Sequence, residues 1–384
     1  MAALWRRRLS WVVGTALIVV ALSVALAIWF RPALTMTMAL TWRRADPWLA
    51  RLQDAVVVEE LSIAAGDRRV PADLYRTSAP GGAIVLVHGL SPLGRRHPDI
   101  VRIARLLARH HRLVLVPQIE GLATFRMSGH EVADLRATLR ALQARTPSVG
   151  IVGFSFGSGP ALLAAADVPG LSLVATFGGY ADLRHIILFL ATGVHRFDGR
   201  QYVQPPEASN RWKLLALMTV AVEDEADRRR LERIAARRLA DRRDDTGELE
   251  RALGPAGQAV LALAMNRRED AIAGLLAALP ASARTGLERL SPLPAIPRLR
   301  GRLLFVHGAG DTSVPFTESL RLAAAAGRTE AVILESFTHI ITPPFWSSLG
   351  RRVRDGGRLV QVFDALLSDR LDRVIEARPL SPAP

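Results

Sequence analysis

Short, mostly apolar runs alternate with amphipathic segments through most of the chain. Helical periodicity fits the segments between them, as at 97–110, where Ile100, Ile103 and Leu107 share one face. Strands that are apolar throughout must be buried on both sides. The pattern therefore predicts an α/β fold with a mostly parallel, doubly wound sheet. The apolar runs lie at residues 83–87, 112–116, 149–152, 171–177, 303–306 and 331–337.

The sheet is expected to begin with an antiparallel hairpin. Two strand-like runs, at 55–63 and 70–76, are separated by the turn sequence Ala-Ala-Gly-Asp-Arg-Arg. A short connection rich in glycine and polar residues joins antiparallel strands more readily than parallel ones. This hairpin should form one edge of the sheet, and a helix at 358–375 should close the domain.

The alternation breaks between residues 183 and 298, where no strand is predicted. This segment contains the charged run 223–251, interpreted as a solvated helix face, and an Ala/Leu-rich run at 257–279. It divides the sheet domain into a first part, 55–182, and a second part with a C-terminal tail, 299–384. The segment is expected to be a helical cap over the site, or else a purely structural helical subdomain.

The N-terminus carries a candidate membrane anchor. Three arginines at 6–8 precede the uncharged stretch Leu9–Phe30, which at 1.5 Å per residue reaches across a bilayer core of about 30 Å. Residues 1–30 are thus expected to be a single-pass transmembrane helix, followed by a juxtamembrane connector at 31–54. A cleaved signal peptide, with Ala25-Leu26-Ala27 as its site, is the alternative.

Charge and composition limit which classes of partner and which cellular compartment are expected. The net charge of +14 comes from dispersed arginines interleaved with acidic residues, which does not indicate a nucleic-acid surface. The absence of cysteine excludes disulfides and thiolate chemistry. A short tail with three arginines tends to stay in the cytoplasm. The catalytic domain is therefore expected outside the cytoplasm, on a bacterial inner membrane.

The most informative motif is Gly153-Phe154-Ser155-Phe156-Gly157, directly after the apolar run 149–152. A serine between a strand and a helix, with glycine two residues to either side, is the pattern of a nucleophile elbow. The glycines are needed because side chains at these places would collide in the strained turn. The helix that follows directs its N-terminus at negative charge on the reacting group.

With further motifs at other strand ends, the chain resembles the α/β-hydrolase superfamily over about residues 55–375. These motifs are Val87-His88-Gly89, Gly310-Asp311-Thr312-Ser313-Val314-Pro315 and Thr338-His339. Serine, aspartate and histidine occur in the order given for this superfamily. The resemblance implies a serine hydrolase with a helical cap and no metal or organic cofactor.

The resemblance also implies a catalytic triad. Ser155 would be the nucleophile, His339 its general base, and Asp311 the acid that orients the imidazole. Asp182 is the rival acid, because it also follows a sheet strand. His88 is the next candidate base, although its place before glycine at a strand end fits a loop-ordering role better; the same holds for the histidine at 307.

Two backbone amides are expected to form the oxyanion hole. One belongs to Phe156, the residue after the nucleophile, and the other to Leu90, in the loop after the first central strand. The predicted activity is cleavage of an ester or related acyl bond, of carboxylesterase or lipase type, on a small-molecule or lipid-like substrate. Thioester and peptide bonds remain open, as does cofactor-free haloperoxidase chemistry. A catalytically silent binding domain at the membrane is the alternative from another class.

Overall fold

An eight-stranded sheet forms the centre of the molecule, with strand order β1-β2-β4-β3-β5-β6-β9-β10. The computed structural model describes residues 2–42, 44–327, 331–335, 337 and 349–367. From β4 to β10 neighbouring strands run parallel, while β2 is antiparallel to both β1 and β4. The strands are β1 (Val57–Ala65), β2 (Arg68–Arg76), β3 (Ala83–Val87), β4 (Leu113–Pro117), β5 (Val149–Phe154), β6 (Leu171–Phe177), β9 (Arg302–Gly308) and β10 (Ala331–Leu334). This mostly parallel sheet fits the α/β-hydrolase fold, and the predicted edge hairpin is confirmed.

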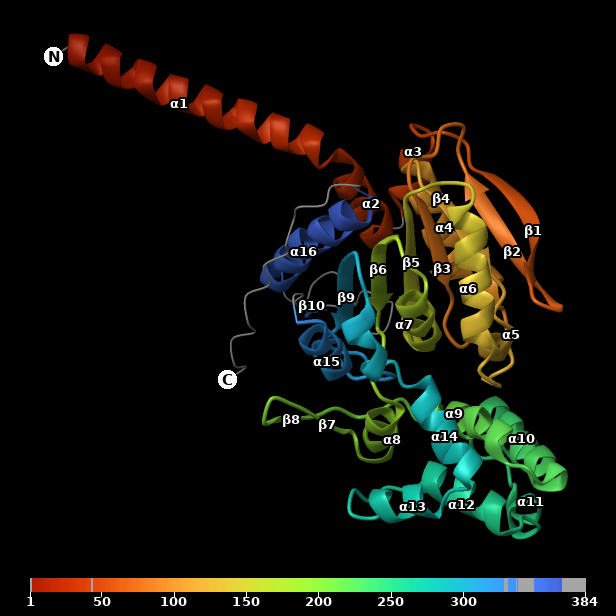
Figure 1. The fold of residues 1–384 in the computed structure, drawn as a ribbon. Helices are drawn as coiled ribbons and strands as arrows, with labels where there is room; N and C mark the ends of the chain where they lie inside the picture. Colours follow the sequence, from red (N-terminus) through yellow and green to blue (C-terminus); the bar gives the residue numbers. More distant parts are fainter. Residues whose placement is uncertain (1, 43, 328–330, 336, 338–348, 368–384) are drawn as a thin grey trace.

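Helices cover both faces of the sheet, as Figure 1 shows. Alternate strand residues point to opposite faces, so Val85 and Ile151 join one core cluster while Leu86 and Val152 join the other. The first face packs against α6 (His130–Gln143), α7 (Ser158–Asp167) and α15 (Thr317–Ala326). The second packs against α2 (Arg31–Thr41), α4 (Pro98–Arg109) and α16 (Leu349–Leu367). The closing helix thus starts earlier than predicted, and residues 368–375 lie outside the described residues.

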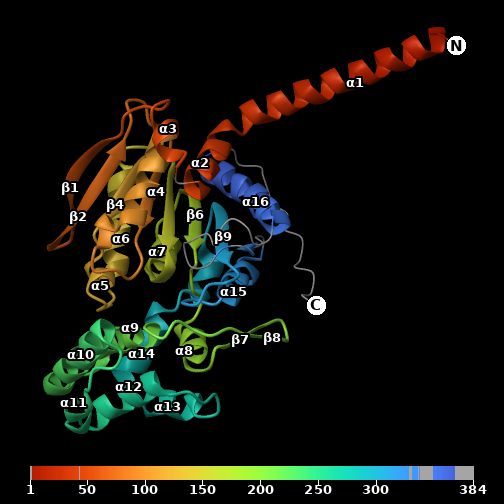
Figure 2. The same cartoon turned by 180° about the vertical axis from the view of Figure 1, so that it is seen from behind.

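Between β6 and β9 the chain leaves the sheet and forms a separate layer of helices beyond the carboxyl ends of the strands (Figures 1 and 2). We call residues 183–298 the helical insertion. Its helices are α8 (Leu183–Thr192), α9 (Asn210–Met218), α10 (Glu225–Ala240), α11 (Gly247–Arg251), α12 (Pro255–Met265), α13 (Ile272–Ala278) and α14 (Ala281–Leu290).

The insertion is not wholly helical, which corrects the prediction that it contains no strand. Strands β7 (Val194–Phe197) and β8 (Arg200–Val203) pair antiparallel as a short hairpin. Their two-residue turn has Asp198 at φ 50° and Gly199 at φ 71°. Asp-Gly favours the positive φ values that this hairpin turn requires. The signal was therefore present in the sequence, although the flanking strands are short.

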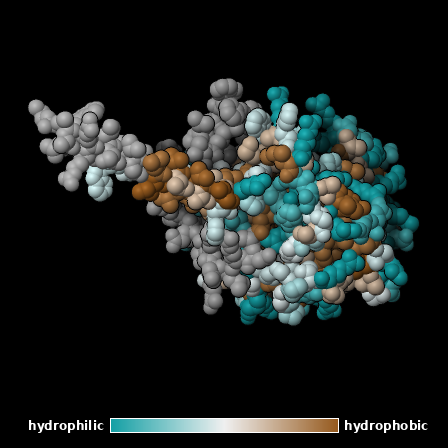
Figure 3. All heavy atoms as spheres, turned by 90° about the horizontal axis from the view of Figure 1, so that it is seen from above, coloured by the Kyte–Doolittle hydropathy of each residue, from teal (hydrophilic) through white to brown (hydrophobic). Residues whose placement is uncertain are grey.

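The N-terminal helix α1 (Ala2–Trp29) projects away from the domain (Figure 1). Its apolar side chains between Leu17 and Trp29 are exposed, and they form the brown segment that extends from the body in Figure 3. No single helix in the part of the chain that the structure describes has both the length and the hydropathy of a membrane span. Leu17–Trp29 and α2 meet these criteria together, with a bend of 71° between them.

Helix α2 belongs to the sheet domain. Ala33, Met36 and Ala39 repeat at intervals of three residues and are about 1% exposed, because this face packs against α16 and α4. Thr35 Oγ1 lies 2.8 Å from His110 Nε2 at the end of α4, and Arg102 donates to the carbonyl of Ala39. Residues 31–41 therefore fix where α1 leaves the domain. Two further short helices of the sheet domain are α3 (Asp46–Ala50) and α5 (Glu120–Ala123).

Candidate active site

The proposed nucleophile stands in a strained turn at the carboxyl end of β5. The strand ends at Phe154, a single 3₁₀ turn covers Ser155–Gly157, and α7 begins at Ser158. Ser155 has φ of 50°, in the left-handed region that a serine rarely adopts. Such strain persists only where the surrounding structure holds it. The strand, turn and helix predicted from the sequence are all present.

Close packing explains the glycines of the elbow. A Cβ at Gly157 would lie 2.1 Å from the carbonyl oxygen of His88, and one at Gly153 would lie 2.6 Å from the Cα of Ser158. Both contacts are to backbone atoms, which cannot move aside without distorting the fold. A Cβ at Gly89 would lie 3.0 Å from Ser155 Cβ, so the loop after β3 passes directly beside the nucleophile.

His88 orders that neighbouring loop. Its Nδ1 lies 2.8 Å from the carbonyl of Gly89, and its Nε2 accepts from the amide of Ile119 at 3.1 Å. Both contacts are satisfied by a neutral imidazole that carries its proton on Nδ1. Burial lowers the pKa of His88 from 6.5 to about 4, so the neutral form is the stable one. His88 is thus a structural histidine, placed where it fixes the backbone around Leu90.

The proposed acid, Asp311, is held in a buried loop after β9. Its side chain is about 1% exposed, and Oδ1 accepts from the amides of Ser313 at 2.8 Å and Val314 at 3.0 Å. Oδ2 lies 3.4 Å from Nε2 of His307. His307 itself contacts Ser319 Oγ and the carbonyl of Val314, so it orders the loop as expected. The carboxylate is therefore oriented by its own loop.

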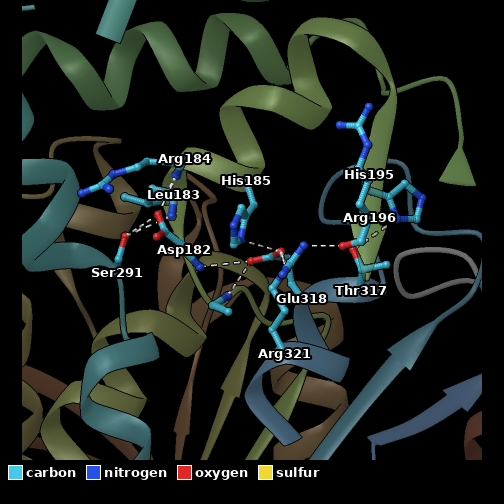
Figure 4. Close-up of polar contacts among 11 residues, drawn as sticks. Asp182, Leu183, Arg184, His185, His195, Arg196, Ser291, Thr317, Glu318 and Arg321 are labelled. Atoms are coloured by element: carbon cyan, nitrogen blue, oxygen red, sulfur yellow. Dashed lines mark hydrogen bonds and ion pairs between the residues drawn. The ribbon is translucent and has the colours of Figure 1, made fainter. Parts of the chain in front are cut away.

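The rival acid, Asp182, has a different task. It is the N-cap of α8: Oδ1 accepts from the amide of Arg184 at 2.8 Å and from Ser291 Oγ at 3.2 Å. Its own amide, with that of Ala181, donates to Glu318 Oε2. Figure 4 shows this cluster, with Glu318 of α15 pointing at the start of the helical insertion. The contacts make Asp182 part of the junction between insertion and core.

Glu318 supports that junction from the core side. It is about 1% exposed, and its Oε1 lies 3.1 Å from His185 Nδ1 and 3.2 Å from Arg321 Nε. Nearby, Tyr180 donates its hydroxyl proton to the carbonyl of Leu290, at the end of α14. Both ends of the insertion are thereby joined to each other and to α15. Sequence reasoning missed Glu318, which lies inside a helix without any motif.

The proposed base, His339, lies outside the described residues. The strand that precedes it, β10, pairs parallel with β9. Because β5, β9 and β10 run parallel, their carboxyl ends lie at the same edge of the sheet. The loop that carries Asp311 and the turn that carries Ser155 are both found there.

A cavity of about 180 Å³ opens over Ser155 between the sheet edge and the insertion. Both oxyanion-hole candidates, Leu90 and Phe156, line it with the nucleophile, so the structure brings these three predicted residues together. The insertion adds polar groups that sequence reasoning did not identify: Glu207, Asn210 and Lys213. Nothing in their spacing marks them, since they reach the site only through the way α9 and the segment before it pack.

A second cavity, of about 340 Å³, extends from Phe156 into the insertion. Its walls are mainly apolar and come from α9, α14 and the turn after α9, with Met127 from the core. Phe156 lines both cavities, so the second one lies directly beside the elbow. Within the described part of the chain, no three histidine, aspartate or glutamate side chains converge as a metal site.

Comparison with known proteins yields similarity in structure only. No family model and no curated sequence matches the chain. Among solved structures, an acylaminoacyl peptidase from Pyrococcus horikoshii is 11% identical with a TM-score of 0.47; the match covers 84% of this chain and 42% of that one. The chain thus spans less than half the length of the peptidase. The esterase domain of a Rhodothermus marinus protein is 17% identical with a TM-score of 0.43, over 81% of this chain and 97% of the domain. A dienelactone hydrolase from Anabaena variabilis is 14% identical with a TM-score of 0.42, and the match covers 80% of this chain and 97% of that one.

Proposed function

We propose that the chain is a membrane-anchored serine hydrolase that cleaves an ester or a related acyl bond through an acyl-enzyme intermediate. The observation that carries the proposal is the backbone of Ser155, held at φ 50° between β5 and α7 by glycines that no larger residue could replace. A strained serine at the mouth of a cavity is difficult to explain as a structural element alone. It is the expected arrangement for an exposed nucleophile.

In the proposed reaction, Ser155 Oγ attacks the carbonyl carbon of the substrate while His339 accepts the hydroxyl proton. The negative charge on the carbonyl oxygen is stabilised by the amides of Leu90 and Phe156. His339 returns the proton to the leaving alcohol, the C–O bond breaks, and Ser155 is left acylated. Water, activated by the same histidine, then releases the acid. Asp311 would hold the imidazole in the required tautomer.

The helical insertion is proposed to act as a cap that selects substrates. Its support is the pair of cavities at Phe156, one containing Ser155 together with several polar side chains, the other lined mainly by apolar side chains of α9 and α14. An apolar cavity beside the nucleophile suits an aliphatic group of the substrate. The exposed apolar length of α1 supports the anchor. We place the domain outside the cytoplasm because three arginines precede the apolar stretch.

Hydrolysis of short 4-nitrophenyl esters by the purified full chain in detergent tests this function. Wild type is expected to turn over acetyl and butyryl esters, while Ser155→Ala and His339→Ala should each lower kcat by about a thousandfold or more. Ser62→Ala, an exposed serine of the edge strand β1, is the matched control and should leave kcat unchanged. Equal turnover by wild type and Ser155→Ala would overturn the proposal.

A further inference from the structure

Lys213 is unusual in this chain because it is the only lysine. The sequence has 50 lysine and arginine residues, and all except Lys213 are arginine. If this one lysine had replaced an arginine at random, it would be expected at the surface, where basic residues are most common. Lys213 instead lines the cavity that contains Ser155. Lysine and arginine differ in shape, since lysine carries a compact charge on a flexible stem and arginine a wide planar fork.

The ammonium group of Lys213 has no counterion among the described residues. Its Nζ donates to Asn210 Oδ1 at 3.1 Å, and no described carboxylate oxygen lies within 4.0 Å of it. Asp99 and Glu207 line the same cavity, but neither forms an ion pair with Lys213. An ammonium group has three protons to donate, and this contact accounts for one. Two donors remain, on a side chain that lines the space where substrate would bind.

The partner of Lys213 is itself firmly placed. Asn210, about 6% exposed, donates through Nδ2 to Ser313 Oγ at 3.0 Å and lies 3.4 Å from the carbonyl of Thr312. Ser313 in turn donates its amide to Asp311. The amide oxygen that holds Lys213 is therefore fixed relative to the loop of the proposed acid. A cation positioned in this way can bind an anion without much loss of conformational freedom.

From these observations we infer that Lys213 binds a carboxylate of the substrate, so that the preferred substrate is an ester that carries a carboxylate group near its scissile bond. The inference rests on the proposed function, since it concerns the same cavity. The bound carboxylate supplies the missing counterion, and its oxygens accept the two remaining protons of Lys213. A neutral ester of the same size fits the cavity but leaves the ammonium group unpaired.

Two pairs of esters test this, each differing in one carboxylate. Monomethyl adipate carries the carboxylate on the acyl side, and methyl hexanoate is its neutral counterpart. 4-Acetoxybenzoate carries the carboxylate on the leaving group, and 4-methylphenyl acetate is its neutral counterpart. Wild type is expected to have the higher kcat/KM for the ester with the carboxylate in at least one pair. Lys213→Met, which keeps length without charge, should lower kcat/KM for that ester about 10- to 100-fold and change its neutral counterpart less than about threefold. Lys213→Arg should retain part of the preference.

Labelling of Ser155 by a fluorophosphonate distinguishes the two possible failures. If wild type neither reacts with the probe nor hydrolyses any of the four esters, the proposed function itself is wrong. If it labels and turns over neutral esters, but both pairs show no preference for the carboxylate, the role of Lys213 is wrong while the function stands. An equal loss on the charged and neutral members in folded Lys213→Met would also overturn the inference, because it would show a general role in catalysis or packing.

Discussion

Ser291 Oγ lies 3.2 Å from Oδ1 of Asp182 and shares its proton between that carboxylate and the carbonyl of Leu287 at 2.7 Å, which joins the two ends of the helical insertion across 109 residues. The same carboxylate caps α8 through the amide of Arg184. Neither contact involves the nucleophile, although Asp182 follows a sheet strand and could be taken for the catalytic acid from its position in the sequence. The pairing indicates a structural acid at the root of the insertion.

This assignment predicts opposite outcomes for two aspartates. Asp182→Ala should destabilise the fold by about 1 kcal/mol through loss of the helix cap, with kcat within a few-fold of wild type. Asp311→Asn should leave a folded protein with kcat lowered by about 10³-fold or more, because it supports the wrong imidazole tautomer. Thermal melts and ester kinetics measure both. A folded Asp311→Asn enzyme with near-normal turnover, beside an inactive Asp182→Ala, would show that Asp182 is the catalytic acid and Asp311 is not.

The apolar cavity beside Phe156 predicts a limit on chain length that a single residue controls. Gly286, in the middle of α14, lines this cavity, and a Cβ added there meets no atom within 4 Å. Gly286→Leu should therefore fill the cavity without disturbing the fold. We expect kcat/KM for octanoyl esters to fall about tenfold or more, while acetyl esters change little.

Gly274→Leu provides the matched control for that substitution. Gly274 lies in α13, also has no atom within 4 Å of an added Cβ, and does not line the cavity. Both changes replace a helical glycine and should stabilise their helices similarly. Loss of octanoyl turnover in both variants, or in neither, would show that the cavity does not bind the acyl chain.

Two buried histidines predict that stability falls in acid. Burial lowers the pKa of both His88 and His195 from 6.5 to about 4. Between these values the unfolded chain binds more protons than the folded one, so the free energy of unfolding decreases as the pH falls from about 6.5 to 4. Melting temperatures measured at intervals across this range should decline. His88→Gln, which cannot titrate, should decline less steeply; a slope equal to that of wild type would contradict the role of His88.

The N-terminal anchor can be tested by a deletion that the structure helps to place. The buried face of α2 begins at Ala33, so removal of residues 1–30 spares the core. Full-length protein is expected to remain in the membrane fraction through high-salt and carbonate washes, while the deletion variant should be largely released. Recovery of a mature chain that begins near Ile28 would instead identify a cleaved signal.

Local signals predicted the sheet and the elbow because their causes are local. Glycine is required at 153 by the backbone of nearby Ser158, and a strand buried on both faces shows as an apolar run. Gly157 is the exception, because the atom that an added Cβ would meet belongs to His88 at the end of β3. The hairpin β7–β8 was also signalled, by Asp198-Gly199, although its strands of four residues are too short for a clear alternation. The sequence was sufficient wherever neighbouring residues determine the structure.

Long-range packing determined what the sequence could not predict. The packing of α2 on α16 joins segments more than 300 residues apart, and no motif at either end announces it. The position of Lys213 depends in the same way on how α9 packs over the sheet edge. Glu318 is buried against amides of a distant loop and stands in an ordinary helical sequence. The role of His339 stays a prediction.

Covalent labelling of Ser155 tests the central claim most directly. The full chain in detergent is incubated with a fluorophosphonate, and the modified residue is located by peptide mass spectrometry. A nucleophile activated by a neighbouring base should form a stable phosphonyl ester at Ser155, and Ser155→Ala should give no adduct. Ser155→Ala must show the same melting behaviour as wild type. A folded wild-type protein that leaves Ser155 unlabelled, or that is labelled equally in Ser155→Ala, would contradict the account.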